Sequence, residues 1–470
     1  MAHDTSYEPI CPPNEPTPSV ITALLSQACV ATNHQVAQRA AGRPATLSGP
    51  HLALGVVSHL VEGWQSRLEV WRRLRFEPIG PFAPVTISNQ AVYERLANHG
   101  IDLMQHLFTL VTTHLAPTTI ATEDRSLAPF APLVVSMDES VLDTMLRRFP
   151  YKEELGHRAP SPLLPPGRIA ALFNIRTQQW HRVDVLPDGQ ANCKVHARAL
   201  LSGLPAGTLV LFDRGYMSFP FFDELTTVGL RWITRASKAT GYPVVHAFVQ
   251  RDDLFDGLVR VGRYRSDHAG YTVRLVRFRH HGQWHSYLTN VLDPLLLSVA
   301  DVIRLYARRW DIELAFRVLQ EHLHLHTHWS QDWPVLALQV WASVIVAQVY
   351  HALQVAVAAE AGCEVFDVSL ALLVRWVPRL LAQGHDPIEV LLHQGRDMGI
   401  IRPSRRHPLD LPTVLLEEIC WPPGDVCLWL PPRYAHKKAG NKNRQGEKQR
   451  KTPGPKSKQT KTDASSPCSS

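Results

Sequence analysis

Apolar positions repeat with helical spacing in the first part of the chain and in shorter, strand-like runs after it. From residue 18 to about 128, apolar side chains recur every three or four positions in residues 19–33, 49–74 and 99–115. This is the spacing of amphipathic helices. After residue 130, short β-branched runs end in polar residues, with a helical segment among them. Such a mixture of strands and helix predicts an α/β sheet.

Individual strands follow from the same pattern. Residues 167–189 are expected to form two strands with a tight turn near Thr177 to Gln179, before a helix over 191–205. Residues 208–213 and 230–237 are two further expected strands. From 238 to 290 the chain is again strand-like, with arginine and apolar side chains alternating near its end. This block precedes the next helix, so we expect an inserted β subdomain over residues 238–295.

A short helix is expected between the second and third helical segments. Ser88 is a suitable N-cap residue, and Val92 and Leu96 lie on one side of the helix that follows it. The opposite side carries polar residues that helix-turn-helix proteins use to read a DNA groove. These candidate DNA-binding residues are Asn89, Gln90 and Arg95. Any short capped helix has the same appearance, so a purely structural role stays open.

Positive charge is concentrated at the C-terminal end. Residues 433–470 contain eleven lysines and arginines and two acidic residues, a net charge of +9 in a chain whose total is +7. The segment has no apolar periodicity, so a disordered arm that binds a polyanion such as nucleic acid is expected. A merely solubilising tail is the alternative.

Other bulk features indicate a cytoplasmic protein that does not enter a membrane. The opening segment is polar and proline-rich, without the apolar stretch of a signal peptide. Residues 335–359 are apolar and long enough to span a bilayer, but three glutamines and a histidine interrupt them, which favours a buried core helix. The seven cysteines lack metal-ligand spacing and are expected to be reduced.

The segment LYARRWDIELAFRVLQEHL, residues 305–323, has helical spacing and two different faces. Five apolar residues share one stripe: Leu305, Ile312, Phe316, Leu319 and Leu323. Steps of four or seven residues bring a second, polar set onto another stripe. That set consists of Tyr306, Arg309, Glu313 and Gln320. A solvated helix face is the ordinary explanation for such a set.

Carboxylates at strand ends give this face a second explanation. Asp138 follows the apolar run PLVVSM and Asp213 follows TLVLF. Side chains at the carboxyl ends of strands project into the crevice where α/β proteins bind ligands. Together with Glu313 they form a set of three carboxylates, which can hold two Mg²⁺ ions for phosphoryl transfer.

Other acids and the histidines are weaker candidates. Glu139 should point away from Asp138 on a strand, and Asp184 lies in the middle of one. Four histidines alternate in EHLHLHTHW without a companion cysteine or carboxylate pattern, which does not favour a metal site. They are His322, His324, His326 and His328. No glycine-rich loop of the P-loop type is present, so ATP is not expected.

At these residues the chain resembles the DDE transposases of bacterial insertion sequences, in the branch called the insertion-sequence-four family. The signature of that branch is Tyr, two residues, Arg, three residues, Glu, six residues, Lys. Tyr306, Arg309 and Glu313 match it, and LVLFDRGY around Asp213 adds to the likeness. The resemblance covers residues 50 to 360. It implies an RNase H-like catalytic core with a β-strand insertion before the last acidic residue.

The resemblance also implies a role for each site residue. Asp138, Asp213 and Glu313 would bind two Mg²⁺ ions, with Mn²⁺ able to replace them, and Tyr306 and Arg309 would contact phosphate beside the cut. A 3′-hydroxyl released at the end of the element would then attack target DNA. In relatives a DNA hairpin forms and an aromatic residue of the insertion holds a flipped base. Trp284 is the candidate here.

One residue departs from the signature. The family's lysine falls at position 320, where this chain has Gln320, so the charge that would meet the DNA backbone is missing. Arg317, on the same helix face, is a candidate to replace it. The change keeps two other functions open, a derivative that only binds DNA and a structure-selective nuclease of the same fold. The partners implied are terminal inverted repeats and target DNA, bound by a homodimer.

The expected organisation has a helical DNA-binding domain, a split catalytic domain and charged or polar ends. Its segments are a disordered start at 1–17, the helical domain at 18–128, the RNase H-like core at 129–237 and 296–400, the insertion at 238–295, a C-terminal extension at 401–432, and the basic tail at 433–470.

Overall fold

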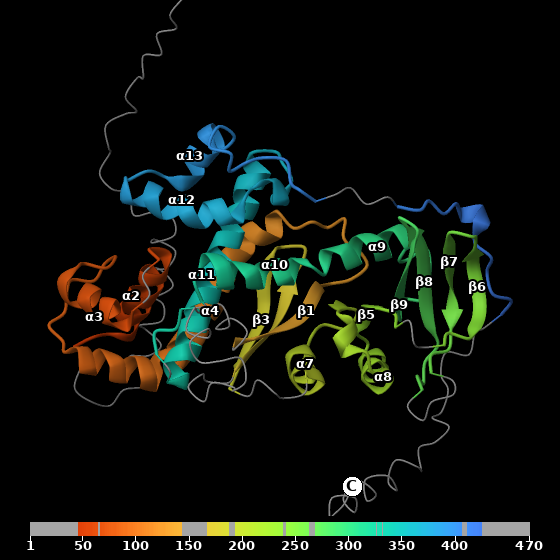
Figure 1. The fold of residues 1–470 in the computed structure, drawn as a ribbon, viewed down its shortest axis with the longest axis horizontal. Coiled ribbons are helices and arrows are strands. Elements are labelled where there is room, and N and C mark those ends of the chain that lie inside the picture. The colour runs from red at the N-terminus through yellow and green to blue at the C-terminus, as the bar shows by residue number, and fades with distance from the viewer. Residues whose placement is uncertain are drawn as a thin grey trace, which may run out of the picture.

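The structure is a computed structural model, and it describes nine stretches of the chain: residues 46–63, 66–142, 167–187, 193–237, 241–262, 268–325, 327–330, 332–406 and 411–424. The first predicted helix, the end of the C-terminal extension, the basic tail and His326 lie outside these stretches. Figure 1 shows a central sheet with helices on both faces and a helical region beside it. The expected α/β class is confirmed.

All nine strands of the described stretches belong to one mixed sheet in the order β3-β2-β1-β4-β5-β9-β8-β7-β6. The bounds of the first five are β1 Val134–Val141, β2 Arg168–Asn174, β3 Gln179–Leu186, β4 Leu209–Phe212 and β5 Arg231–Arg235. Strand β4 is parallel to both β1 and β5, whereas β2 pairs antiparallel with β1 and β3. The predicted turn between β2 and β3 is confirmed.

Four antiparallel strands extend the sheet beyond β5. They are β6 Val244–Gln250, β7 Leu254–Val259, β8 Val273–His280 and β9 Gln283–Thr289, and β9 pairs with β5. Within them Arg274 and Asp256 form a fully buried ion pair, with Nε and Oδ1 2.6 Å apart. Arg274 also donates to the Leu297 carbonyl at 2.6 Å, which ties these strands to the chain that follows. The strands therefore continue the sheet rather than forming a separate layer.

Helices cover the two faces of the sheet unequally. α7 (Cys193–Leu201) and α8 (Phe219–Thr227) pack on one face, against buried core residues such as Val135, Met137 and Phe212. The opposite face packs against α10 (Asp311–Arg317) and the long α11 (Trp333–Glu360). The side chains of alternate residues on β1 thus meet two different sets of helices.

The helical region contains α2 (Gly49–Val61), α3 (Arg67–Phe76) and α4 (Asn89–Ala121). Ser88 caps α4 as predicted, since its hydroxyl accepts from the Ala91 N–H at 3.3 Å. The prediction of two helices between residues 89 and 115 was wrong, because α4 is continuous over 33 residues. Gly100, which marks the expected break, is buried, and a Cβ there would overlap the Leu338 side chain on α11. This glycine allows two helices to pack closely rather than ending one.

α11 is the core helix that its sequence predicted. Of the described part of the chain, it is the one helix long and apolar enough to cross a membrane, and 89% of its most apolar window is buried inside the protein. Gln348, an apparent interruption, bonds to both backbone groups of Trp180 on β3, at 2.8 and 3.1 Å. Polar residues in this helix therefore connect it to the sheet.

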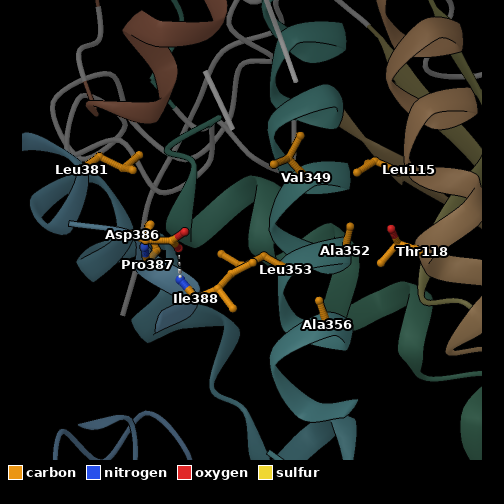
Figure 2. A pocket seen from close by; sticks show the side chains of 10 residues that line it. All are labelled: Leu115, Thr118, Val349, Ala352, Leu353, Ala356, Leu381, Asp386, Pro387 and Ile388. Atoms are coloured by element: carbon orange, nitrogen blue, oxygen red, sulfur yellow. Dashed lines mark hydrogen bonds between the residues drawn. The ribbon is translucent and has the colours of Figure 1, made fainter. Parts of the chain in front are cut away.

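Two helices complete the fold and border an apolar pocket. They are α12 (Leu370–Ala382) and α13 (Pro387–Gln394). Figure 2 shows the pocket, into which Leu115 of α4, Leu353 of α11 and Ile388 of α13 project. None of the three candidate carboxylates lines it. Beyond α13, residues 411–424 reach the far edge of the sheet, where the Cys420 N–H donates to the Phe248 carbonyl at 2.8 Å.

The segment predicted as one helix over residues 305–323 is divided into three parts. α9 (Val299–Arg308) ends before Arg309, α10 begins at Asp311, and a π-helical turn spans Val318–His322. The single straight helix was therefore wrong, although its five apolar residues are all buried, as predicted. The Ser136 hydroxyl donates to the Arg309 carbonyl at 3.0 Å, so the sheet itself takes up a backbone group at the break.

Candidate functional site

The two aspartates lie side by side at adjacent parallel strands, Asp138 within β1 and Asp213 directly after β4, where it caps a short 3-10 helix, Arg214–Tyr216. Met137 of β1 is paired with Phe212 of β4, so Asp138 and Asp213 are the next pair in the same register. Adjacent strands are about 4.8 Å apart, and paired residues project from the same face. Asp138 does not end its strand as predicted, because β1 continues to Val141 along β2; it stands where the pairing with β4 ends.

Glu313 reaches this pair from α10, and Arg309 joins them. The Arg309 guanidinium lies 2.5 Å from Glu313 Oε1 through Nη2 and 3.7 Å from Asp138 Oδ2 through Nη1. Its side chain is only 9% exposed, so both contacts are shielded from solvent. The helix break described above sets Arg309 at the end of α9 and Glu313 in the first turn of α10.

Burial raises the pKa of Asp138 to about 6, against an ordinary value of 3.8. The Glu139 N–H and the Arg309 guanidinium oppose this rise, while the charges of Glu313 and Asp213 add to it. Carboxylates that repel one another in a sheltered place are typical of sites that bind a cation or move a proton. The site therefore has a surplus of negative charge that Arg309 offsets in part.

Tyr306 closes one side of the site. Its ring lies 4.6 Å from that of Tyr287 on β9 and 5.8 Å from the Arg309 guanidinium. Burial raises its pKa to about 12, with Asp213 among the charges that act on it. Tyr306 is thus held as a neutral phenol next to the acids.

The sequence interpretation missed Arg235, the last residue of β5. Phe212 pairs with Thr234, so Asp213 and Arg235 are the next pair in register, and Arg235 in turn pairs with Tyr287. Arg235 is exposed on the face that carries the acids. A polar residue directly after the run RWIT is the same signal that identified Asp213 after LVLF, and it could have revealed this arginine.

Trp310, between Arg309 and Asp311, was also not singled out. It is 48% exposed, an unusual degree for tryptophan, and its ring lies 5.8 Å from the Arg309 guanidinium. The break between α9 and α10 brings it to the surface beside the acids. It offers a flat apolar face of the kind that stacks against a base.

Gln320 and Arg317 lie on the same segment but in different surroundings. Gln320 is half-buried and donates to the Ser140 hydroxyl at 3.1 Å, two residues along β1 from Asp138. Arg317 is exposed. The π-helical turn beginning at Val318 changes the angle between Glu313 and position 320, so these residues do not follow one straight stripe.

Trp284 lies on the other face of the sheet. It is paired with Arg279 and is 39% exposed, with the Arg277 guanidinium 5.0 Å from its ring. Since successive residues of a strand alternate between faces, Trp284 and Tyr287 point in opposite directions. Tyr287 is the residue that reaches Tyr306, so Trp284 does not face the acids.

The three candidates on α4 have separate environments. Asn89 and Gln90 are exposed in the first turn of the helix. Arg95 is half-buried and donates to the Leu47 carbonyl, which gives it a structural contact. Because α4 is one long helix, these residues do not form the short helix of a helix-turn-helix unit.

The rival acids lie on the opposite face of the sheet, since Glu139 and Asp184 are both paired with Ala170. Glu139 points to the opposite face of β1, where it pairs with Arg168 and lies 3.9 Å from His196. Asp184 is mid-strand in β3, paired with Ala170. Within the described stretches, no three histidine, cysteine or acidic side chains are grouped closely enough to hold a metal ion, and this includes Asp138, Asp213 and Glu313.

The candidate site thus consists of an aspartate within β1, an aspartate directly after β4, a glutamate on α10 and an arginine that contacts Asp138 and Glu313. Residues 153–348 match the family model of the transposase DDE domain. This segment includes Asp213, Glu313 and α10, so the part of the chain that carries most of the site is similar to transposase DDE domains. A comparison with curated proteins found no match.

Among solved structures, the chain is similar to a piggyBac transposase in a synaptic complex with hairpin DNA. The identity is 11% and the TM-score 0.37, over 84% of this chain and 85% of that one. A likeness of this degree establishes neither a shared fold nor a shared function.

Proposed function

We propose that this protein is a DDE transposase that cuts DNA at the ends of a transposable element and joins them to target DNA. The observation that carries the proposal is the register of Asp138 with Asp213, facing Glu313 on α10. Asp213 and Glu313 lie in the segment, residues 153–348, that is similar to transposase DDE domains. The strand order β3-β2-β1-β4-β5, with β2 and β3 antiparallel, supports an RNase H-like core. In this view β6–β9 are the insertion before the last acid.

Several finer points belong to the same proposal. The signature residues Tyr306, Arg309 and Glu313 favour the insertion-sequence-four branch and a bacterial source, with cut-and-paste transposition by a homodimer bound to two DNA ends. The division into domains given above is retained, with the helical region as a DNA-binding unit. The protein would act in the cytoplasm, at the nucleoid.

In their chemistry the acids fit a divalent cation, although in this structure the Arg309 guanidinium contacts Asp138 and Glu313 and the three acids are not grouped as closely as metal ligands. Carboxylate oxygens are the ligands that Mg²⁺ prefers, and the charges of Glu313 and Asp213 act on Asp138 strongly enough to help raise its pKa. Asp138, Asp213 and Glu313 would hold Mg²⁺ or Mn²⁺. When bound, such ions would lower the pKa of water and stabilise charge on the attacking and leaving oxygens.

The remaining residues would hold the DNA. Arg309, already next to Asp138 and Glu313, can offer its guanidinium to the phosphate at the cut. Tyr306 is a neutral phenol that can donate a hydrogen bond to a phosphate oxygen. Arg235, one strand away from Asp213, can bind the next phosphate of the same strand, and Trp310 can stack on an unpaired base.

The test is cleavage of DNA that carries the inverted repeats flanking the reading frame. The substitutions Asp138→Asn, Asp213→Asn and Glu313→Gln should each abolish cleavage with Mg²⁺ while leaving binding to end DNA largely intact, because they remove a ligand and keep the shape. Normal cleavage by any one of these variants removes that residue from the site.

The products separate this function from its alternatives. Wild-type protein should release a 3′-hydroxyl and join it to target DNA. A 3′-hydroxyl without joining would indicate a structure-selective nuclease instead. Binding of ends without any cleavage would indicate a derivative that only binds DNA.

A further inference from the structure

The start of α10 depends on a buried acid that the proposed chemistry does not use. Asp311 lies between Arg309 and Glu313 in sequence, and its side chain is fully buried. Its two oxygens accept from Arg308 Nε at 2.6 Å, Arg406 Nη2 at 2.6 Å and Gln178 Nε2 at 3.0 Å. A buried carboxylate with this many donors is fixed in position, because moving it would leave several charged groups unpaired.

This anchoring matters because α10 lacks the usual means of fixing a helix start. The helix has only seven residues, and Trp310, its N-cap residue, makes no side-chain capping bond. Asp311 occupies the first helical position, where a carboxylate is favoured by the helix dipole. Arg309 and Glu313 stand two residues before and two residues after Asp311 in sequence.

Two of the donors to Asp311 come from distant parts of the chain. Gln178, in the turn between β2 and β3, has φ of 54°. This left-handed conformation is costly for a residue other than glycine, and such strain is often found where a side chain has a functional position to keep.

Arg406 comes from the segment after α13, which the sequence suggested was only an extension. Its guanidinium lies 3.4 Å from the centre of the Phe366 ring. Nearby, the Ser404 N–H donates to Asp367 Oδ1 at 2.7 Å. The segment is therefore docked on residues 365–367 immediately before it reaches Asp311.

We propose that Asp311 is a positioning residue for Arg309 and Glu313, and that Arg406 is a positioning residue that acts through Asp311. The C-terminal segment up to residue 406 is then part of the catalytic unit. Only the kinetic test of this inference, the rate of DNA cleavage, rests on the proposed function.

The experiment compares Arg406→Gln with the matched control Arg405→Gln. Arg405 is an exposed neighbour of the same charge, outside the set of donors to Asp311. Single-turnover cleavage at saturating end DNA should fall about tenfold in Arg406→Gln, with DNA affinity close to wild type. The thermal midpoint should also fall, because the buried carboxylate loses a charged partner, so the rate is measured well below it. Arg406→Lys should recover part of the rate, because it restores the charge next to Asp311. Arg405→Gln should cleave like wild type.

A second readout does not require activity. Hydrogen exchange of the peptide covering residues 309–317 should be faster in Arg406→Gln than in Arg405→Gln, also in a preparation that cleaves no DNA. Faster exchange with no wild-type cleavage would contradict the proposed function and leave the positioning role supported. Equal exchange and equal cleavage rates in the two variants would overturn the positioning role. Faster exchange spread over the whole protein in Arg406→Gln, rather than centred on residues 309–317, would also overturn it.

Discussion

Arg235 places a cation one strand away from Asp213, on the face of the sheet that carries the acids. Substituting it tests whether DNA crosses the sheet at this point. In Arg235→Gln, binding to end DNA should weaken and its log–log salt slope should decrease by about one, because one phosphate is no longer neutralised. The measurement is affinity for end DNA across a salt series.

Arg279→Gln provides the control for this variant. Arg279 is exposed on β8 and is paired with Trp284, on the other face of the same sheet. The substitution removes the same charge from the same protein, so a general electrostatic effect would appear in both variants. Equal slopes for the two would show that DNA does not approach Arg235.

Gln320 allows a test of the departure from the family signature. Gln320→Lys should tighten binding to end DNA by roughly 1 kcal/mol and steepen the salt slope by about one unit, because a cation is added two turns from Glu313. The same substitution removes the hydrogen bond to Ser140. Its removal should lower the free energy of unfolding by about 1 kcal/mol.

Gln320→Met separates charge from hydrogen bonding at this position. It removes the bond to Ser140 without adding charge, so its stability should fall as in the lysine variant and its salt slope should stay at the wild-type value. If the lysine and methionine variants have the same slope, position 320 does not face DNA. Arg317→Ala, measured in the same series, shows whether the exposed arginine already binds that phosphate.

At the scale of elements, α11 carries a histidine that should make stability depend on pH. Burial lowers the pKa of His351 to about 4 from 6.5, while Asp311 acts weakly in the other direction. His351 packs on the Phe173 ring, and neither of its ring nitrogens has a hydrogen-bond partner among the described residues. As the pH falls, this histidine is protonated in the unfolded chain before it is protonated in the folded protein. Its contribution to the free energy of unfolding should therefore be fully present above pH 6.5 and decrease as the pH falls toward 4.

The size of this effect is about 1.4 kcal/mol for each pH unit within that window. In His351→Phe the free energy of unfolding should decrease less steeply between pH 6.5 and 4, as measured by denaturant titration at several pH values. His59 on α2, whose pKa burial also lowers to about 4, should keep part of the dependence. The control His393→Gln, on an exposed position of α13, should leave the pH dependence of the free energy of unfolding unchanged. If His351→Phe also leaves that dependence unchanged, His351 takes up protons in the folded protein as readily as in the unfolded chain.

Elements were predictable from sequence where a single local pattern determined them. The strands that lead to Asp138 and Asp213, the β2–β3 turn and the buried helix α11 all follow from apolar runs and turn residues, although β1 continues past Asp138. The misses have tertiary causes. Gly100 suggested a helix boundary but permits contact with Leu338, and the break at Arg309 is supported by Ser136, far away in sequence.

The site was predictable in its acids and less so in its surroundings. Local spacing identified Tyr306, Arg309 and Glu313, because they follow one another in a short segment. Arg235 and Arg406 could not be placed next to these residues from the sequence. Their positions depend on how the strands pair and on where the chain runs after α13, and the pattern of apolar and polar residues does not contain this information. Trp284 is the opposite case. An aromatic residue suits the role of holding a flipped base, but the pairing of β8 with β9 places Trp284 on the face of the sheet that does not carry the acids.

At the scale of the whole molecule, charge is divided between residues 1–432 and the C-terminal tail. Residues 433–470 carry a net charge of +9 and the rest of the chain −2. Any attraction to DNA that does not depend on sequence should therefore come mainly from this tail, which lies outside the described residues. Deleting 433–470 should weaken binding to all DNA sequences alike and lower the salt slope by about 0.9 for each phosphate that the tail neutralises.

A variant of full length, with the eleven lysines and arginines of 433–470 replaced by glutamine, distinguishes charge from chain length. It should behave like the deletion, since counterion release depends on charge alone. Cleavage at saturating DNA should be retained in both, because Asp138, Asp213 and Glu313 lie in the folded part. An unchanged salt slope would mean that the tail only keeps the protein in solution. Weaker binding limited to end DNA would mean instead that the tail reads sequence, which its charge by itself cannot do.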